Sequence, residues 1–360
     1  MNNRTLLKYH SWFGLLAGAF IFIMGLSGAI LVFQHDIEDN LWKEYSQIED
    51  YSTLEIDKGF ETVQKKYPDW SIRLIHFNEG EALMFNLRRP TERLFLFVHP
   101  STGEILKELN ELTTFSRWLL KFHYSFQAGV FGRILVFIAG MLYFISLLTG
   151  LFLYRRSLLK VLLFQEKINF KSRRSLNSSL HRVVGVWALL LNTLLAVTGL
   201  FLSYEVVMAS LAEPQMPDSP IVTTPIKKVL EEISDKNPNF SPTYISLPAS
   251  ENGAVSIFGL YEDDPFYFSE FYNSFTADYR TGDITASSRI QEADLSTKLK
   301  STLIPLHFGN FGGIWTKLLY CFAGLSGPLL SITGFIIWQK GNRTRKKKKR
   351  VKKIIFHSFL

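Results

Sequence analysis

Four long stretches of the chain contain no charged side chain, and segments rich in charge separate them. Each stretch has 21 to 23 residues, and they lie at positions 11–33, 134–154, 183–204 and 318–338. An apolar stretch of this length crosses the roughly 30 Å hydrocarbon core of a bilayer as a helix. The pattern therefore predicts a membrane protein with four transmembrane helices, because a soluble protein divides its apolar residues among short amphipathic elements.

The segments that join these stretches differ strongly in charge. Residues 1–10, 155–182 and 340–360 carry 20 Lys and Arg and the single acid Glu166, whereas the rest of the chain has 20 basic and 31 acidic residues. By the positive-inside rule the three basic segments face the cytoplasm. We expect a membrane protein with both termini in the cytoplasm, including a tail at 339–360, and with the two large loops on the outer side of the membrane.

The tail contains a basic run from Arg345 to Arg350. Clustered cations can bind nucleic acid through its phosphates. A polybasic stretch beside a membrane span more often binds anionic lipid and fixes topology. We therefore expect the lipid bilayer as a partner and no nucleic acid.

Composition limits the chemistry that the chain can perform. The single cysteine, Cys321, excludes an intramolecular disulfide, a cysteine zinc site and an iron–sulfur cluster. The Gly-x-Gly-x-x-Gly, phosphate-loop, His-Glu-x-x-His and Gly-x-Ser-x-Gly motifs are absent, so nucleotide binding, zinc proteolysis and serine hydrolysis lack support. Metal or redox chemistry must use His, carboxylates or a bound cofactor.

The second half of the chain repeats the first, with an offset that grows from about 171 to about 184 residues. The matching positions are His10 to Gly14 with His181 to Gly185, Ser27-Gly28 with Thr198-Gly199, Thr102-Gly103 with Thr281-Gly282, His123 with His307, and Thr149-Gly150 with Thr333-Gly334. Each half has a span, an outer domain, an interfacial segment with a histidine (116–133 or 303–317) and a second span. Because each half begins and ends on one side of the membrane, the repeat is parallel.

Each outer domain, 34–115 and 205–302, has the pattern of a small α+β fold. The predicted elements are a helix at 56–66 with strands at 72–77, 82–87 and 94–98, and then a helix at 226–234 with strands at 244–247, 255–260 and 267–276. The aromatic run from Phe266 to Tyr272 can bind a ligand, although packing or membrane contact is more usual for such a run.

The chain resembles the PepSY-associated transmembrane proteins. The resemblance rests on Tyr67-Pro68-Asp69-Trp70, on the turn from Pro100 to Leu106 and on the histidine before the following span, and it extends from His10 to Trp338. Such proteins are often called iron-regulated membrane proteins, and some are inner-membrane ferric-siderophore reductases that contain haem. The resemblance implies a bacterial inner-membrane protein with two PepSY-like periplasmic domains and a role in iron uptake.

Four histidines follow the repeat, His10 and His181 at the cytoplasmic face and His123 and His307 at the outer face. A haem iron accepts two neutral imidazoles from facing helices and needs no cysteine. We expect His10 with His181, and His123 with His307, to be the axial ligands of two haems b, in agreement with the resemblance. The alternative is that each histidine simply lies among lipid headgroups.

His35 is a lower-ranked outer ligand because it aligns with Val206 and has no counterpart in the second half. Six glycines near the histidines either admit the porphyrin or pack helices; they are Gly14, Gly129, Gly132, Gly185, Gly309 and Gly312. His76 and His99 are expected to have surface or structural roles, and His357 lies in the tail.

The sequence-based hypothesis is a haem reductase that passes electrons across the inner membrane to a periplasmic ferric siderophore. No cytoplasmic segment exceeds about 28 residues, so a quinol or a separate reductase must supply the electrons. The alternatives are a scaffold whose PepSY-like domains bind or restrain a periplasmic protein, and a transporter; a dimer is possible in each case. The acidic balance of the outer domains favours a cationic or neutral chelate.

Overall fold

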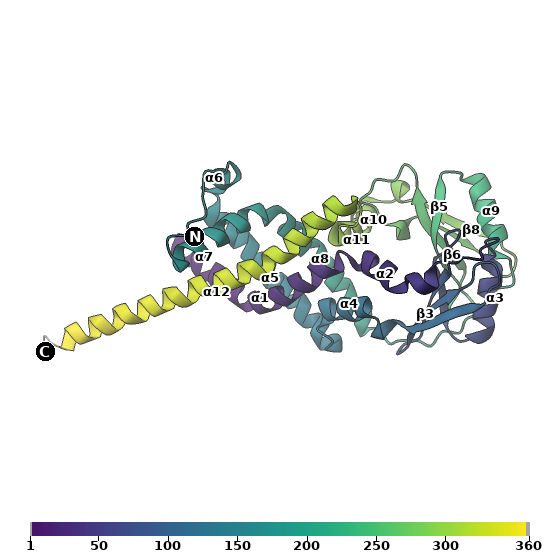
Figure 1. Ribbon diagram of the computed structural model, residues 1–360, viewed down its shortest axis with the longest axis horizontal. Helices are drawn as coiled ribbons and strands as arrows, with labels where there is room; N and C mark the ends of the chain where they lie inside the picture. Colours follow the sequence, from purple (N-terminus) through teal and green to yellow (C-terminus); the bar gives the residue numbers. More distant parts are fainter. Residues whose placement is uncertain (1, 358–360) are drawn as a thin grey trace. The chain divides into compact units, whose positions relative to one another are not determined.

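The computed structural model describes residues 2–357, and it describes side chains for residues 2–341. The chain forms two compact units (Figure 1). The helical unit comprises Met1–Val32, Leu120–Leu211 and Leu306–Leu360, and the sheet unit comprises Phe33–Leu119 and Ala212–Pro305. The side chains of the run Arg345 to Arg350 and of His357 lie outside the described residues.

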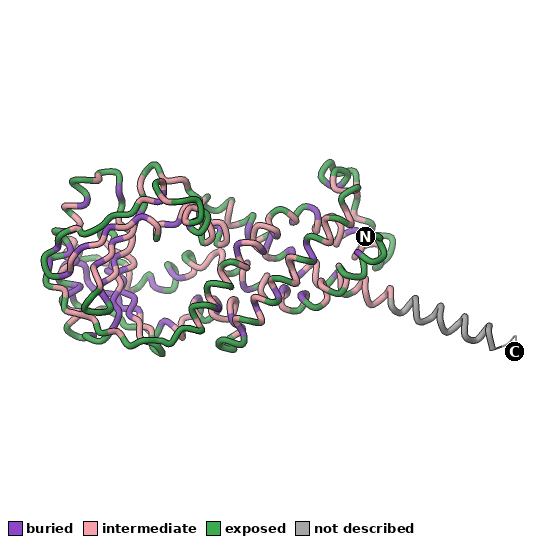
Figure 2. The backbone as a smooth tube through the Cα atoms, turned by 180° about the vertical axis from the view of Figure 1, so that it is seen from behind, coloured by how far each residue is buried: buried purple, intermediate pink, exposed green. Residues whose placement is uncertain are grey.

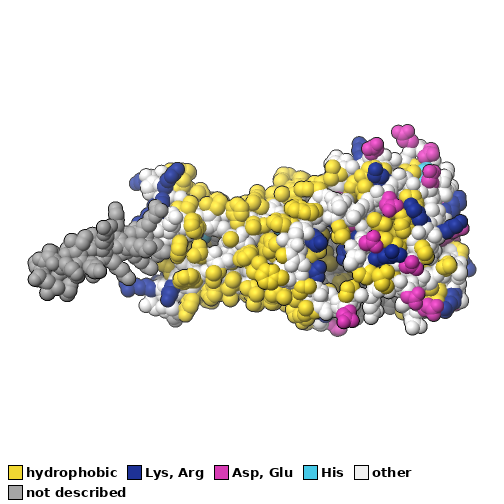
Figure 3. All heavy atoms as spheres, turned by 90° about the horizontal axis from the view of Figure 1, so that it is seen from below, with side chains coloured by type: hydrophobic (Ala, Val, Ile, Leu, Met, Phe, Trp, Pro, Cys, Tyr) yellow, Lys and Arg dark blue, Asp and Glu magenta, His cyan; other side chains and the backbone are white. Residues whose placement is uncertain are grey.

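Within its described residues, the helical unit has four helices that are long and apolar enough to cross a membrane. They are α1 (Asn3–Leu31), α5 (Gly129–Tyr154), α8 (Leu189–Leu211) and α12 (Gly313–His357), whose apolar part ends at Gly341. Hydrophobic side chains make up most of the visible surface along the helices of this unit (Figure 3). The prediction of a four-helix membrane protein is confirmed.

Small residues allow α1 and α12 to approach closely. A Cβ atom on Gly25 would lie 2.5 Å from the carbonyl oxygen of Gly324 and 2.6 Å from Cδ of Pro328. Helices in a bilayer gain little from burying apolar surface against each other, so close backbone packing at small residues stabilises their contact. Helix α1 also packs against α5, and α5 packs against α8.

Shorter helices precede or join the spanning helices. They are α4 (Phe115–Ser125), α6 (Leu158–Leu162), α7 (Arg173–Trp187) and α11 (Leu303–Phe308). The third predicted span, 183–204, differs from the structure because α7 ends at Trp187 and α8 continues to Leu211. Helix α7 begins within the predicted loop, where Ser172 and Ser175 form a capping box.

The sheet unit is built on one antiparallel sheet of eight strands in the order β4-β3-β2-β1-β5-β6-β7-β8. The strands are β1 (Ser71–His76), β2 (Leu83–Arg88), β3 (Arg93–Val98), β4 (Ile105–Asn110), β5 (Phe240–Ser246), β6 (Val255–Tyr261), β7 (Ser274–Ala277) and β8 (Ile284–Ser288). The α-helices of this unit include α2 (Gln34–Ser46), α3 (Ile56–Lys66), α9 (Ile226–Lys236) and α10 (Leu295–Ser301).

The core of this unit lies on the sheet face that α3 and α9 cover. Val63 of α3 and Ile233 of α9 pack with strand residues such as Phe85 and Ile257, and all four are fully or almost fully buried. Buried positions gather in these strands (Figure 2). On the opposite face, Trp42 of α2 packs against part of β2 and β3.

The strands of the two predicted outer domains form a single sheet. Strands β1 and β5 pair with Arg73 opposite Ser246. This pairing satisfies two strand edges that separate domains would leave open, and open edges favour aggregation. The prediction of a helix at 56–66 is confirmed.

The strand predictions missed two elements and misjudged a third. Strands β4 and β8 lie at the sheet edges and are largely exposed. Because neither face of these strands is deeply buried, their sequences show only a weak apolar alternation. The strand predicted at 267–276 covers only Ser274–Ala277, because Ser269 caps a 3₁₀ turn at Glu270–Tyr272.

We predict that Asp57→Ala destabilises the sheet unit. Oδ1 of Asp57 in α3 accepts a hydrogen bond of 2.6 Å from the backbone N–H of Ile226, at the start of α9. The residue before α9, Pro225, makes no side-chain cap hydrogen bond. Losing a cap of this kind costs about 1 kcal/mol.

The measurement is the thermal unfolding of the full chain in detergent. Asp57→Asn keeps an oxygen acceptor and should retain most of the stability, while Asp235→Ala, at an exposed position of α9, serves as the control. Equal stability of Asp57→Ala and the unsubstituted chain would show that Asp57 does not cap α9.

Candidate functional site

The four repeated histidines all lie in the helical unit, and each imidazole packs against a different spanning helix. His10 of α1 contacts α5, His123 of α4 contacts α1, His181 of α7 contacts α12, and His307 of α11 contacts α8. All four side chains are partly buried. The same kind of contact is thus made four times by residues far apart in the sequence.

Nδ1 of each imidazole lies within hydrogen-bond distance of a serine or threonine hydroxyl. The Nδ1 distances are 2.9 Å for His123 to Ser27, 2.9 Å for His181 to Thr333, 2.9 Å for His307 to Thr198, and 3.3 Å for His10 to Thr149. Nδ1 of His10 also lies 3.0 Å from the carbonyl oxygen of Ser146.

The partners of Nδ1 determine which ring nitrogen carries the proton. A carbonyl oxygen only accepts, so Nδ1–H of His10 donates to Ser146. The hydroxyl oxygen of Ser27 also lies 2.9 Å from the carbonyl oxygen of Ile23, and that of Thr198 lies 2.8 Å from the carbonyl oxygen of Leu194. A hydroxyl has one proton, so both of its contacts are hydrogen bonds only when it donates to the carbonyl and accepts from the imidazole. These hydroxyls therefore accept from Nδ1–H. The hydroxyl of Thr333 also accepts from Nδ1–H, because it contacts the carbonyl oxygen of Leu329 in the same way.

This arrangement leaves Nε2 of each imidazole with a free lone pair. Within the part of the chain that the structure describes, none of the four Nε2 atoms makes a hydrogen bond. A neutral imidazole with Nδ1–H bonded and Nε2 bare is the form that ligates a metal.

A glycine follows each of the four hydroxyl residues, and its missing side chain leaves room for the ring. A Cβ atom would lie 3.1 Å from Cε1 of the imidazole at Gly28, 3.2 Å at Gly150, 2.9 Å at Gly199 and 3.3 Å at Gly334. Each imidazole therefore packs against a Ser-Gly or Thr-Gly pair on a neighbouring helix, and we call this pair the receptor of the histidine. The sequence reveals these pairs as repeated motifs but not as contacts of the histidines.

The histidines form two groups at different depths. The rings of His10 and His181 have centroids 6.2 Å apart and planes at 76°. Two imidazoles that bind one metal ion from opposite sides at about 2.0 Å have centroids roughly 6 Å apart, so this pair has suitable spacing. His123 and His307 lie close enough to interact electrostatically. Along α1, His10 and the His123 partner Ser27 are about 25 Å apart.

The other sequence candidates lie elsewhere. His35 is exposed on α2 in the sheet unit. None of the six glycines considered for porphyrin contact lies against a histidine ring. A Cβ on Gly132 would meet the carbonyl of Ser125, one on Gly309, where φ is +71°, would meet the ring of Tyr320, and one on Gly129 would meet nothing within 4 Å.

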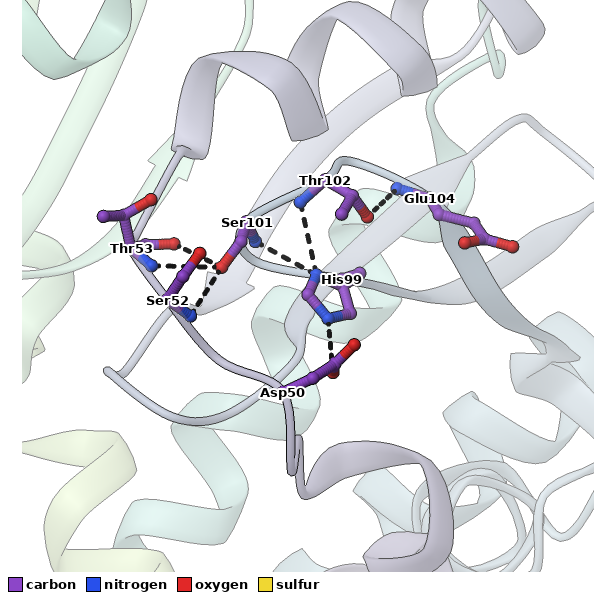
Figure 4. A network of polar contacts seen from close by, with 7 residues as sticks. All are labelled: Asp50, Ser52, Thr53, His99, Ser101, Thr102 and Glu104. Atoms are coloured by element: carbon purple, nitrogen blue, oxygen red, sulfur yellow. Dashed lines mark hydrogen bonds and ion pairs between the residues drawn. The ribbon is translucent and has the colours of Figure 1, made fainter.

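His99 in the sheet unit is a useful contrast because both of its ring nitrogens are occupied (Figure 4). Nδ1 accepts the backbone N–H groups of Ser101 and Thr102, each at 3.2 Å, and Nε2–H donates to Asp50 at 2.9 Å. This hydrogen bond from His99 lowers the pKa of the Asp50 carboxyl. His99 therefore stabilises a turn, and neither of its ring nitrogens is free to bind a ligand.

The chain belongs to the PepSY-associated TM region family, whose model matches residues 7–340. The match covers all four histidines and all four hydroxyl–glycine pairs. No curated protein matches the chain.

We predict different effects of two Gly→Ala substitutions in the helical unit. Gly199→Ala lowers the thermal unfolding midpoint, because the new methyl group overlaps the His307 ring, and overpacking costs about 1–3 kcal/mol. Gly185→Ala is neutral or stabilising, because its Cβ would lie 3.5 Å from Leu330 and alanine favours the helix. Equal effects of both substitutions, measured on the full chain in detergent, would contradict the receptor role of Gly199.

Proposed function

We propose that the protein is an inner-membrane haem reductase that passes electrons across the bilayer to a ferric siderophore in the periplasm. In this proposal His10 and His181 hold one haem b, and His123 and His307 hold a second. The observation that carries it is the set of four imidazoles with Nδ1–H bonded and Nε2 free. Haem with two imidazole ligands takes up and releases single electrons.

The hydroxyl partners support a ligand role for the histidines. A metal-binding histidine usually donates its second ring N–H to an oxygen, which fixes the tautomer and ring orientation and makes the ligand more basic. Ser27, Thr149, Thr198 and Thr333 offer this oxygen. A histidine that merely lies among headgroups has no need for a receptor of this kind in each of four places.

The chemistry of the donor set favours haem over a metal ion bound by side chains alone. Within the described residues, no group of three or more His, Cys, Asp or Glu side chains is placed to hold a metal ion. Two imidazoles are sufficient for an iron whose remaining four ligands come from a macrocycle. Apolar helices provide the surroundings that such a macrocycle requires.

The recurrence of the arrangement supports a parallel repeat with one haem near each membrane face. His10 meets Thr149-Gly150 in the first half, and His181 meets Thr333-Gly334 in the second. With the basic segments in the cytoplasm, the pair of His10 and His181 lies on the side of the electron donor, a quinol or a separate reductase. The pair of His123 and His307 lies on the periplasmic side.

Reduction of the chelate has a clear chemical purpose. Ferrous iron is a softer and less highly charged ion than ferric iron, so oxygen-rich siderophores hold it less tightly. An electron outlet on the periplasmic side would therefore help to release iron for uptake.

We predict about two haems per purified chain, with a low-spin spectrum after reduction with dithionite. His123→Ala and His181→Ala should each lose about one haem, because each removes one ligand of a different pair. His35→Ala is the matched control and should keep the full complement, since His35 is exposed on α2. The measurement is the optical spectrum with haem quantified per chain.

A colourless protein after expression with ample haem would overturn the proposal. It would favour a scaffold that binds a periplasmic protein. Equal haem loss in His35→Ala and His123→Ala would contradict the assignment of the outer pair.

A further inference from the structure

Three arginines from adjacent strands share the sheet face opposite the one that α3 and α9 cover. Arg88 of β2 lies directly opposite Arg93 of β3, and Arg73 of β1 lies opposite Asn86, two positions along β2 from Arg88. Residues paired across antiparallel strands point to the same face, and so do alternate residues of one strand. All three arginine side chains are partly buried.

The positive charge of this cluster is not balanced by nearby acids. Within the described residues, the guanidinium groups of Arg73 and Arg93 make no hydrogen bond or ion pair. Nε of Arg88 donates to Oδ1 of Asn86 at 2.6 Å, and the amide of Asn86 donates to the buried carboxylate of Glu111 at 2.7 Å. Glu111 is thus the carboxylate bonded within the cluster, and Glu270 lies within electrostatic range of the adjoining Tyr244, so two carboxylates face three guanidinium groups.

The arrangement costs free energy in the absence of a ligand. Like charges directly opposite each other destabilise a sheet. Burial, followed by repulsion from Arg73 and Arg93, lowers the pKa of Arg88 to about 10. This value lies far above neutral pH, so Arg88 remains a cation and the repulsion persists. An anion bound between the guanidinium groups would relieve it.

Aromatic rings adjoin the arginines on the same face. Tyr244 of β5 lies within electrostatic range of Arg73 and Arg88. Its ring makes edge contacts with Phe271 at 5.3 Å and with Phe258 at 5.8 Å. Guanidinium groups bind anionic oxygens in pairs, while aromatic rings pack against flat organic groups.

We propose that this arginine face, defined by Arg73, Arg88 and Arg93, binds an anionic metal chelate with catecholate or carboxylate oxygens. The proposal rests on the proposed reductase function and specifies its substrate class. It departs from the expectation that the acidic outer segments favour a cationic or neutral chelate, because the local charge at the arginine face is opposite to the average. The ligand is a soluble chelate rather than an anionic lipid headgroup.

The test uses gallium(III) chelates, which have the charge and shape of the ferric complexes but are not reduced. Isothermal titration of the full chain in neutral detergent compares an anionic gallium tris-catecholate with a neutral gallium tris-hydroxamate. The anionic chelate should bind more tightly, and Arg73→Gln and Arg93→Gln should each weaken it roughly tenfold or more. Because no electron transfer is involved, the result is independent of haem content.

Three controls make the outcome decisive. Arg280→Gln removes an exposed arginine of the β7–β8 turn and should leave the affinity unchanged. Arg93→Lys keeps the charge and should restore part of the binding lost in Arg93→Gln. Thermal unfolding should show that Arg93→Gln is at least as stable as the unsubstituted chain without ligand, because a repulsion is removed.

Either of two outcomes would overturn the proposal. One is equal affinity for both chelates, or no binding of either, with no effect of the arginine substitutions. The other is displacement of the anionic chelate by phosphatidylglycerol added to the micelles at an equal concentration, which would assign the arginine face to lipid headgroups. If the chelate binds as expected but the protein lacks haem, the arginine face stands and the reductase proposal fails.

Discussion

The hydrogen bond between a histidine Nδ1–H and a hydroxyl on a neighbouring helix is the interaction on which the membrane part of this protein depends. An imidazole at membrane depth is costly unless its polar atoms have partners. The hydroxyl provides one partner, and the adjacent glycine lets the ring reach it. The same contact holds short helices such as α11 against the spanning helices. This one local arrangement therefore packs the short helices against the spanning helices, fixes the proton on Nδ1 and leaves Nε2 free to bind a ligand.

The two units divide the work that the proposed function requires. The helical unit supplies apolar surroundings and four fixed imidazoles. The sheet unit supplies a rigid surface, because its core is fully buried under α3 and α9 and both groups of strands share one sheet. A rigid sheet can maintain the repulsion among three arginines that a flexible loop would relieve. Binding sites commonly retain such unfavourable charge at a cost in stability.

The sequence predicts those features that depend on local patterns. Charge-free stretches reveal the four spans, helical spacing reveals residues 56–66, and the repeat isolates four histidines from eight. Features formed by contacts between distant residues were not predictable. The meeting of His307 with Thr198, the pairing of β1 with β5, and the alignment of Arg88 with Arg93 all depend on tertiary register. The sequence does not reveal the edge strands β4 and β8, because exposed strands lack a clear apolar alternation.

The most direct test of the central claim is the electron paramagnetic resonance spectrum of the oxidised protein. The account predicts two low-spin ferric signals typical of two imidazole ligands. Thr333→Val, which removes the hydroxyl partner of His181, should shift one signal and leave the other unchanged. Ser331→Ala removes a hydroxyl that donates to the carbonyl of Gly327 in its own helix, and it should change neither signal. A high-spin spectrum, or signals that do not respond to Thr333→Val, would contradict the account.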